Sequence, residues 1–189
     1  MMKVLVTGGT GVLGRELVPR LQSAGYTVRV MSRRPAGVLR EPRRRDEWPE
    51  TEWAQADVES GPGLAEAVAG VDVILNAVTS PFKRTRQVDV DGARRLVERA
   101  KEAGVRHFLH VSIVGVERIP FPYYQHKVAG EKVVMEGGVP WSILRATQFH
   151  SLLDGLLLSF TRFPVALLDT HLKFQPIDAG QVAALQHLP

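Results

Sequence analysis

Tyr123 and Lys127 are two residues of this sequence whose types and spacing could do chemistry. They stand four residues apart in the segment PYYQHK (122–127), and at this spacing two side chains lie on one face of a helix. A phenol with a pKa of ~10 gives up its proton slowly at neutral pH, and a neighbouring ammonium lowers that pKa because it stabilises the phenolate. The pair could therefore protonate a carbonyl oxygen while a nicotinamide supplies a hydride. A tyrosine packed beside an unrelated surface lysine would show the same spacing.

A glycine-rich turn could bind the phosphates of such a nicotinamide cofactor. The stretch TGGTGVLG (7–14) follows an apolar run that predicts a buried strand, and it opens a segment with helical spacing. Gly8 can take a tight turn, Gly11 lets the backbone reach a phosphate, and Gly14 lets the helix pack closely on the strand. Free N–H groups and the dipole at a helix N-terminus favour a pyrophosphate there. The residues expected to contact the cofactor in this turn are Gly8, Thr10, Gly11, Val12, Leu13 and Gly14.

The end of the second predicted strand indicates which dinucleotide is bound. It reads SRRP (32–35) and has no carboxylate to bind the 2′-hydroxyl of NAD. Arg33 and Arg34 could instead hold the 2′-phosphate of NADP through charge-assisted hydrogen bonds. The sequence therefore favours NADP, with NAD as the alternative. Two exposed arginines that bind no ligand would give the same pattern.

The next two strands also end in candidate cofactor contacts. Asp57 and Val58 end the third strand, where we expect them to border the adenine. Asn76, Ala77 and Val78 end the fourth strand, where the middle of the cofactor should lie. In an open parallel sheet, ligands bind outside the carboxyl ends of the strands, so these residues should face one site.

The elements that must position these residues alternate along the chain. Apolar runs predict strands, and helical spacing of apolar residues predicts helices between them. The strands are nearly continuous in apolar residues, which is typical of a parallel sheet covered on both faces. We therefore predict a doubly wound, Rossmann-type α/β fold with three layers, α/β/α. Strands are expected at 3–9, 26–32, 51–57, 71–78, 105–112, 139–146 and 172–178, and helices at 12–24, 63–70, 91–104 and 123–138.

Length and composition fit one NAD(P)-binding domain over 1–189. Hydrophobic residues make up 44% of the 189 residues and charged residues 23%, which is typical of a globular protein. The absence of cysteine excludes disulfides and thiolate metal sites, and the six histidines show no ligand spacing, so no metal is expected. The N-terminus is a poor signal peptide, and charges interrupt the most apolar segment (151–168). These features predict a cytoplasmic protein that does not enter a membrane.

Positive charge is concentrated in one connection. The net charge is +4, and six arginines lie between Arg33 and Arg45. This cluster could bind an anion or form a solvated loop. Nucleic acid is a weaker alternative and is not expected as a partner, because no aromatic residues alternate with the arginines to stack on bases.

Several motifs together resemble a known family. TGGTGVLG, GVDVILNAV, EAGVRHFLHVS, YYQHKVAGE and VPWSILRATQF are similar to segments of the short-chain dehydrogenase/reductase superfamily, in particular its atypical, NmrA-like NAD(P)-binding members. The likeness runs from Lys3 to about Asp178. It implies the same doubly wound fold and an NAD(P) cofactor.

The resemblance also implies roles for individual residues. The catalytic Tyr-x-x-x-Lys pair of the superfamily matches Tyr123 and Lys127, and the lysine would also hold the cofactor ribose. The catalytic serine position falls on Ile113, so Ser112, one residue earlier, is the candidate third catalytic residue. The helper asparagine of the superfamily is replaced by Asp89.

Two functions follow from these observations. The first is an NADP-dependent oxidoreductase that reduces a small carbonyl or enone, with a substrate pocket built from 79–85, 113–122 and 147–172. The second is a non-catalytic, NmrA-like regulator that senses the dinucleotide and contacts a protein partner. Members of the family usually continue beyond the FQPID segment (174–178), so the substrate side is expected to be short or truncated. Apolar surface at 152–168 could then form a homo-oligomer contact.

Overall fold

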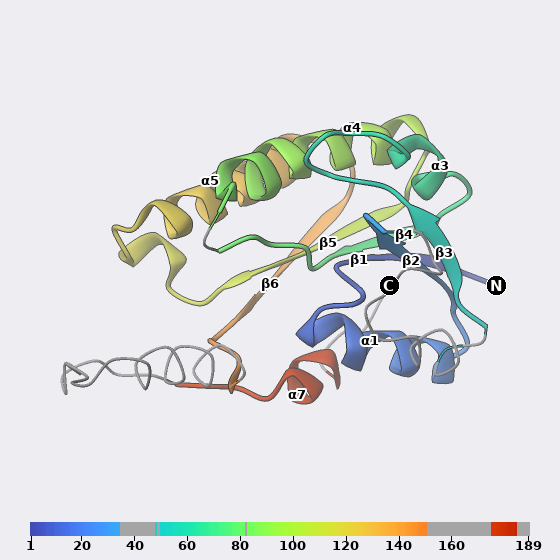
Figure 1. The fold of residues 1–189 in the computed structure, drawn as a ribbon, viewed down its shortest axis with the longest axis horizontal. Coiled ribbons are helices and arrows are strands. Elements are labelled where there is room, and N and C mark those ends of the chain that lie inside the picture. The colour runs from blue at the N-terminus through green and yellow to red at the C-terminus, as the bar shows by residue number, and fades with distance from the viewer. Residues whose placement is uncertain (35–47, 49, 82, 151–174, 185–189) are drawn as a thin grey trace.

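A six-stranded, entirely parallel sheet forms the centre of the computed structural model (Figure 1). The structure describes residues 1–34, 48, 50–81, 83–150 and 175–184. The strand order is β3-β2-β1-β4-β5-β6, so the order reverses between β1 and β4. The strands are β1 (Lys3–Thr7), β2 (Thr27–Ser32), β3 (Glu52–Gln55), β4 (Val73–Asn76), β5 (His107–Ile113) and β6 (Trp141–Ala146).

Helices cover both faces of this sheet. Figure 1 shows α1 (Val12–Ser23) and α7 (Ala179–Ala184) on one face, and α3 (Leu64–Val68), α4 (Ala93–Glu102) and α5 (Pro122–Glu136) on the other. Two separate apolar cores lie between the sheet and these two layers. The predicted doubly wound, three-layer α/β/α fold is therefore confirmed. Among the helices that the structure describes, none is long and apolar enough to cross a membrane.

Side chains of β5 alternate between the two cores. Phe108 belongs to the core beneath α3 and α4, whereas Leu109 belongs to the core beneath α1. Because side chains of a strand point alternately to opposite faces, Ser112 shares the face of Phe108, and Ile113 shares the face of Leu109. This alternation decides which β5 side chains lie on the α4 side of the sheet and which lie on the α1 side.

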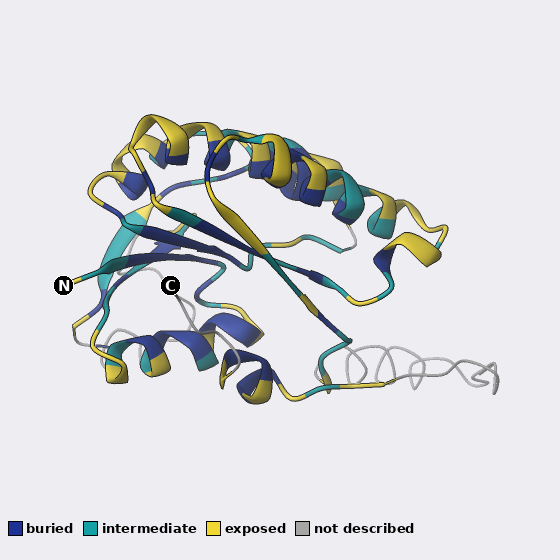
Figure 2. Ribbon diagram, turned by 180° about the vertical axis from the view of Figure 1, so that it is seen from behind, coloured by how far each residue is buried: buried dark blue, intermediate teal, exposed yellow. Residues whose placement is uncertain are grey.

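The edges of the sheet are more exposed than its centre. Figure 2 shows buried residues along the central strands and on the inner faces of α1 and α4, and exposed residues along part of β6. Every residue of β4 is buried, whereas β6 exposes Trp141, Ser142 and Arg145. The candidate residues at the ends of β1 and β4 thus rest on the best-packed part of the fold.

The fold differs from the predicted elements in four places. The expected helix at 91–104 is preceded by a π-helix, η1 (Arg86–Gly92), and a short 3₁₀ helix, η2 (Val116–Arg118), follows β5. Residues 172–174 of the expected last strand lie outside the described residues, and Ile177 forms only an isolated bridge with Phe149. Helix α7 was not predicted. Segment 152–168 and the arginines from Arg40 to Arg45 also lie outside the described residues.

Candidate functional site

The glycine turn between β1 and α1 is held against the end of β4. Gly8 has a φ of +69°, a left-handed conformation that side chains other than glycine rarely adopt. A Cβ atom on Gly8 would lie 2.9 Å from the carbonyl carbon of Ala77. The tight turn expected at this position is therefore present, and it presses on the segment that follows β4.

Gly14 and Gly11 have different surroundings. A Cβ atom on Gly14 would lie 2.4 Å from the Gly8 oxygen, because the first turn of α1 packs directly on the glycine turn. A Cβ atom on Gly11 would meet only the Gly8 oxygen, at 3.1 Å. Gly11 is the N-cap of α1, and among the described residues no side-chain hydrogen bond caps this helix start. The helix start is thus open to a ligand at Gly11, as anion binding requires.

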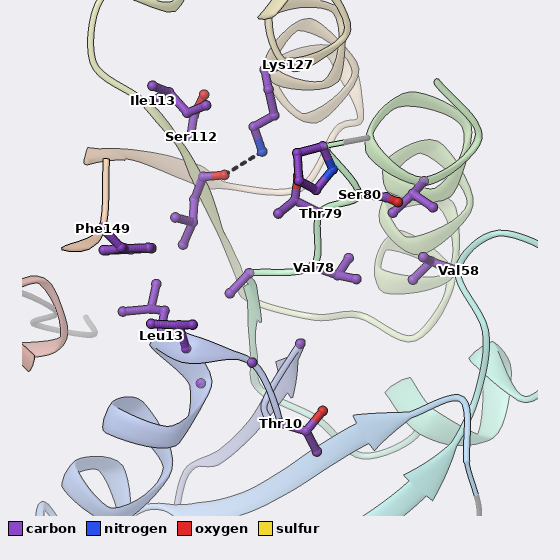
Figure 3. A pocket seen from close by; sticks show the side chains of 18 of the residues that line it. Thr10, Leu13, Val58, Val78, Thr79, Ser80, Ser112, Ile113, Lys127 and Phe149 are labelled. Atoms are coloured by element: carbon purple, nitrogen blue, oxygen red, sulfur yellow. Dashed lines mark hydrogen bonds between the residues drawn. The ribbon is translucent and has the colours of Figure 1, made fainter. Parts of the chain in front are cut away.

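A cavity of about 1020 Å³ opens at this place. It extends from the glycine turn past the ends of β2 and β4 to β5 and α5 (Figure 3). Its volume lies at the upper end of the usual range for ligand pockets, about 300–1,000 Å³. The predicted residues that line it are Gly8, Thr10, Gly11, Val12, Leu13, Gly14, Arg33, Arg34, Val58, Ala77, Val78, Ser112, Tyr123 and Lys127.

Two predicted cofactor contacts, Asp57 and Asn76, are not among the lining residues. The Asp57 carboxylate instead organises its own turn: Oδ1 accepts the backbone N–H of Glu59 at 3.0 Å, and Oδ2 accepts the Ser60 hydroxyl at 2.8 Å. The structure thus brings Val58 to the cavity and keeps the side chain of Asp57 in the loop that follows β3.

Asn76 belongs to a buried polar row beneath the cavity. Thr7, Asn76 and His110 are paired in register across β1, β4 and β5. The Thr7 hydroxyl donates to Asn76 Oδ1 at 2.6 Å, and Asn76 Nδ2 lies 3.0 Å from His110 Nδ1. Burial, with a smaller effect of the Lys127 charge, lowers the pKa of His110 to about 3. His110 is therefore neutral and its Nδ1 accepts a hydrogen bond from the Asn76 amide, and the row connects the ends of the three strands.

Lys127 is paired with Asp89. Its ammonium donates to the Val111 carbonyl oxygen at 2.9 Å, the hydrogen bond drawn in Figure 3, and lies 3.3 Å from Asp89 Oδ1. The side chains of Lys127 and Asp89 are only 3% and 0% exposed. The charge of Lys127 is thus balanced inside the protein.

Tyr123 lines the same cavity, but its acidity differs from the prediction. Its hydroxyl lies 3.2 Å from the Thr79 hydroxyl. Burial raises the pKa of Tyr123 to about 12, and the Asp89 charge adds to this effect. The expected lowering of this pKa by Lys127 is therefore not found: burial of the phenol dominates, and the Lys127 ammonium is paired with Asp89.

Ser112 contributes to the cavity wall, but its hydroxyl does not join Tyr123. The Ser112 oxygen is buried and makes no hydrogen bond with any described residue. It lies close enough to Glu131 to help lower the pKa of that carboxyl. At the next position of β5, Ile113 lines the cavity with an apolar side chain. The structure therefore does not bring the serine hydroxyl to the Tyr123 phenol.

The two arginines at the end of β2 are exposed at the cavity rim. The Ser32 hydroxyl accepts the backbone N–H of Arg34 at 3.2 Å, which shapes the start of this connection. Within the part of the chain that the structure describes, neither guanidinium forms an ion pair. No carboxylate of the described residues therefore neutralises these two charges at the rim.

The sequence did not assign chemistry to Thr79 or Ser80, although it placed 79–85 at the substrate side. Both follow β4 directly, line the cavity, and contact Asp89: Thr79 donates to Oδ1 at 2.7 Å and the Ser80 N–H to Oδ2 at 3.1 Å. Their place at a strand end is the signal that could have found them. The last part of the expected substrate side is represented in the cavity by Thr147, Gln148 and Phe149, and 151–172 lies outside the described residues.

Comparison with known proteins assigns the family. A family model described as NAD(P)H-binding matches residues 8–154, which include the glycine turn, β2 to β6 and the Tyr123–Lys127 helix. The chain belongs to this NAD(P)H-binding family. The resemblance to the short-chain dehydrogenase/reductase superfamily is thereby confirmed, together with the expectation of an NAD(P) dinucleotide site.

Proteins that are similar to this chain in sequence include both an assembly factor and a reductase. The chain is 30% identical over 155 residues to the photosystem II assembly factor Ycf39 of Trieres chinensis, covering 79% of this chain and 46% of the relative. It is 31% identical over 150 residues to the (4-alkanoyl-5-oxo-2,5-dihydrofuran-3-yl)methyl phosphate reductase of Streptomyces griseus, covering 78% and 48%. The chain thus spans about half the length of these relatives.

A solved structure shows the same fold with a dinucleotide. A short-chain dehydrogenase/reductase superfamily protein from Agrobacterium tumefaciens with bound NAD superimposes with a TM-score of 0.64 and 29% identity. The match covers 78% of this NAD(P)H-binding chain and 50% of the other. It supports an oxidoreductase-like, dinucleotide-binding architecture.

Proposed function

We propose that this protein binds NADP(H) along the cavity, with the pyrophosphate on the start of α1. The observation that carries the proposal is the open helix N-terminus at Gly11, where no side chain of the described residues forms a cap and a Cβ atom would meet only one oxygen. This opening lies beside the reversal of strand order between β1 and β4. Doubly wound sheets bind ligands at such reversals, and helix N-termini favour phosphates.

The preference for the phosphorylated dinucleotide rests on the cavity rim. Arg33 and Arg34 are exposed there, and no described carboxylate neutralises them. A 2′-phosphate would accept charge-assisted hydrogen bonds from both guanidinium groups. Val58, Ala77 and Val78 would provide apolar surface between this rim and the glycine turn.

The proposed activity is the reduction of a small carbonyl or enone. A bound reduced nicotinamide supplies the hydride for such a reaction. The chain would supply the proton from the Tyr123 hydroxyl, which lines the cavity and stays protonated at neutral pH because its pKa is raised to about 12. Ile113 and Phe149 would give the substrate an apolar wall. The reductase of Streptomyces griseus among the relatives supports this assignment.

A second function, binding of the dinucleotide without turnover, is favoured by one specific observation. The buried Asp89–Lys127 pair removes the positive charge that would make Tyr123 a stronger acid. A regulator that senses the dinucleotide needs the binding cavity and does not need an acidic phenol. The Ycf39 assembly factors among the relatives are compatible with such a role.

Titration of the purified chain with NADPH and NADH, followed by fluorescence, tests the binding proposal. We expect saturable binding of both with tighter binding of NADPH; failure to bind either at millimolar concentration would exclude both functions. NADPH consumption with aldehydes, ketones, enones and quinones then separates the two. Turnover that disappears in Tyr123→Phe while NADPH still binds supports the reductase, and binding without turnover supports the sensor.

A further inference from the structure

Four side chains form a continuous polar chain along one wall of the cavity. The Lys127 ammonium lies 3.3 Å from Asp89 Oδ1, the Thr79 hydroxyl donates to the same oxygen at 2.7 Å, and the Tyr123 hydroxyl lies 3.2 Å from Thr79 Oγ1. The backbone N–H of Ser80 donates to the second carboxylate oxygen at 3.1 Å. Asp89 therefore receives three donors and is the centre of this chain.

The direction of the hydrogen bond between Tyr123 and Thr79 follows from these contacts. A threonine hydroxyl has one proton and can accept through its lone pairs. Because the Thr79 hydroxyl donates its hydrogen bond to the Asp89 carboxylate, its oxygen can only accept a hydrogen bond from Tyr123. The phenol proton thus points to Thr79.

We propose that Asp89 is a positioning residue that keeps Tyr123 a neutral phenol, because it balances the charge of Lys127 and holds the Thr79 proton away from the phenol oxygen. A phenolate at this place could be stabilised by the ammonium or by a hydroxyl that donates to it. Asp89 contacts both the Lys127 ammonium and the Thr79 hydroxyl. This role of Asp89 rests on the proposed function only where Tyr123 transfers a proton to a substrate. The effect on Tyr123 itself involves residues of this chain alone and does not require a cofactor.

The electrostatic surroundings of Tyr123 agree with this arrangement. Burial raises the pKa of Tyr123, and the charges of Asp89 and Tyr124 raise it further. The ring of Tyr124 packs edge-on beside that of Tyr123, with 5.3 Å between the ring centroids. The hydrogen bond with Thr79 acts in the opposite direction and lowers the pKa of Tyr123, but burial outweighs this effect and the Thr79 proton is committed to Asp89. The other charged residues that line the cavity make no hydrogen bond with Tyr123: they are Arg15, Arg33, Arg34, Glu59, Lys83 and Arg84, of which Arg84 is paired with Glu59.

This arrangement has a chemical consequence for the ligand. A ligand carbonyl must compete with Thr79 for the phenol proton. A ligand hydroxyl can instead donate to the phenol oxygen and leave the chain from Lys127 to Tyr123 intact. Asp89 thereby weakens Tyr123 as a proton donor and leaves it able to accept a hydrogen bond.

The test is a pH titration of Tyr123 in the full chain, observed by NMR of tyrosine labelled with ¹³C at Cζ and assigned with Tyr123→Phe. In Asp89→Asn the ammonium is no longer balanced and the Thr79 proton is released, so we expect the pKa of Tyr123 to fall by roughly 1 to 3 pH units. Asp91→Asn removes the same charge two residues further along η1, where no described residue pairs with it, and should leave the titration unchanged. A folded Asp89→Asn protein with the wild-type titration would overturn the proposal.

A second variant tests the direction of the hydrogen bond and keeps both members of the buried pair, although it removes one donor to Asp89. Thr79 is exposed, so Thr79→Val should fold normally. If Tyr123 donates to Thr79, loss of this acceptor leaves the pKa of Tyr123 unchanged or lower. A higher pKa in Thr79→Val would show that Thr79 donates to Tyr123 and would overturn the proposal even if Asp89→Asn does not fold. Both titrations are made without cofactor, so their outcome is independent of whether the protein binds NADPH.

Discussion

Gly14 in α1 lies so close to Gly8 that a Cβ atom on Gly14 would come within 2.4 Å of the Gly8 oxygen. This contact fixes the start of the helix against the turn. We expect Gly14→Ala to lower the free energy of unfolding by about 1–3 kcal/mol, because the extra methyl group has no space. Urea denaturation at pH 7 measures the loss in the free energy of unfolding. An unchanged value would show that the glycine turn can shift to accommodate the methyl group.

Gly11→Ala adds the same methyl group three residues earlier, where it faces the cavity. We expect its stability to stay within about 1 kcal/mol of the wild type, as for a modest change at an N-cap. Its affinity for NADPH should fall about tenfold or more, which corresponds to about 1.4 kcal/mol, because the methyl group lies where the pyrophosphate would approach the helix start. Fluorescence titration of both variants checks this contrast. Equal affinity of Gly11→Ala and wild type would place the pyrophosphate elsewhere.

Arg33 and Arg34 give a prediction on cofactor choice. In the double variant Arg33→Ala/Arg34→Ala, NADPH should bind at least about 100-fold more weakly, because charge-assisted hydrogen bonds contribute about 1.5–3 kcal/mol each. NADH, which has no 2′-phosphate, should lose much less. Arg94→Ala/Arg99→Ala on exposed positions of α4 removes the same net charge away from the cavity and serves as the control. Equal losses for the two dinucleotides would contradict the assignment of these arginines to the 2′-phosphate.

The sequence predicted the fold and the glycine turn because both depend on local patterns. Apolar strand runs, helical spacing and Gly8, Gly11 and Gly14 are read directly along the chain. The partners of Tyr123 depend instead on residues distant in sequence. Thr79 and Asp89 lie 44 and 34 positions before Tyr123. They come together only through the loop after β4 and the π-helical turn of η1. A π-helix is rare, and the spacing of apolar residues does not predict it.

Ser112 shows a second limit of the sequence argument. A shift of one residue along a strand moves a side chain to the opposite face of the sheet. The candidate serine stands one position before the position that the family resemblance indicates, and the structure places its hydroxyl beside Glu131. A motif match that is one residue out of phase in a strand therefore does not carry over a catalytic role.

His110 predicts a specific acid sensitivity. Its pKa is lowered from 6.5 to about 3, first by burial, so between these values the unfolded chain binds a proton that the folded chain does not. Stability is therefore fully present above pH ~6.5 and falls as the pH decreases, by about 2 kcal/mol between pH 7 and pH 5 from this residue. His110→Asn keeps an acceptor near Asn76 but does not titrate, so its urea denaturation should show a smaller loss between these pH values. The same pH dependence in both proteins would refute this role of His110.

The ion pair between Glu131 and Arg145 joins α5, which carries Tyr123 and Lys127, to the edge strand β6. Arg145 donates from Nε to Oε1 at 3.0 Å and from a terminal nitrogen to Oε2 at 2.7 Å. Burial acts to raise the pKa of Glu131, but the hydrogen bonds and charge of Arg145 outweigh it, and the pKa is lowered. The pair therefore stabilises the folded state above the usual carboxyl pKa, and this contribution is lost as the pH falls through the lowered value.

Arg145→Met should change how the free energy of unfolding depends on pH. Glu131, which is 4% exposed, would keep a buried charge without its main partner, so we expect a loss of about 1–2 kcal/mol at pH 7, less than for a fully buried pair because Arg145 is 40% exposed. Without Arg145, burial would raise the Glu131 pKa, opposed only by Ser112 and Lys127, so the loss should shrink between pH 7 and pH 5 as the carboxylate takes up a proton. Adding Glu131→Gln removes the unpaired charge and should restore part of the stability at pH 7. Urea denaturation of the three proteins at both pH values decides: a loss that is independent of pH and is not reduced by Glu131→Gln would mean that Arg145 acts through packing of its side chain and not through its charge.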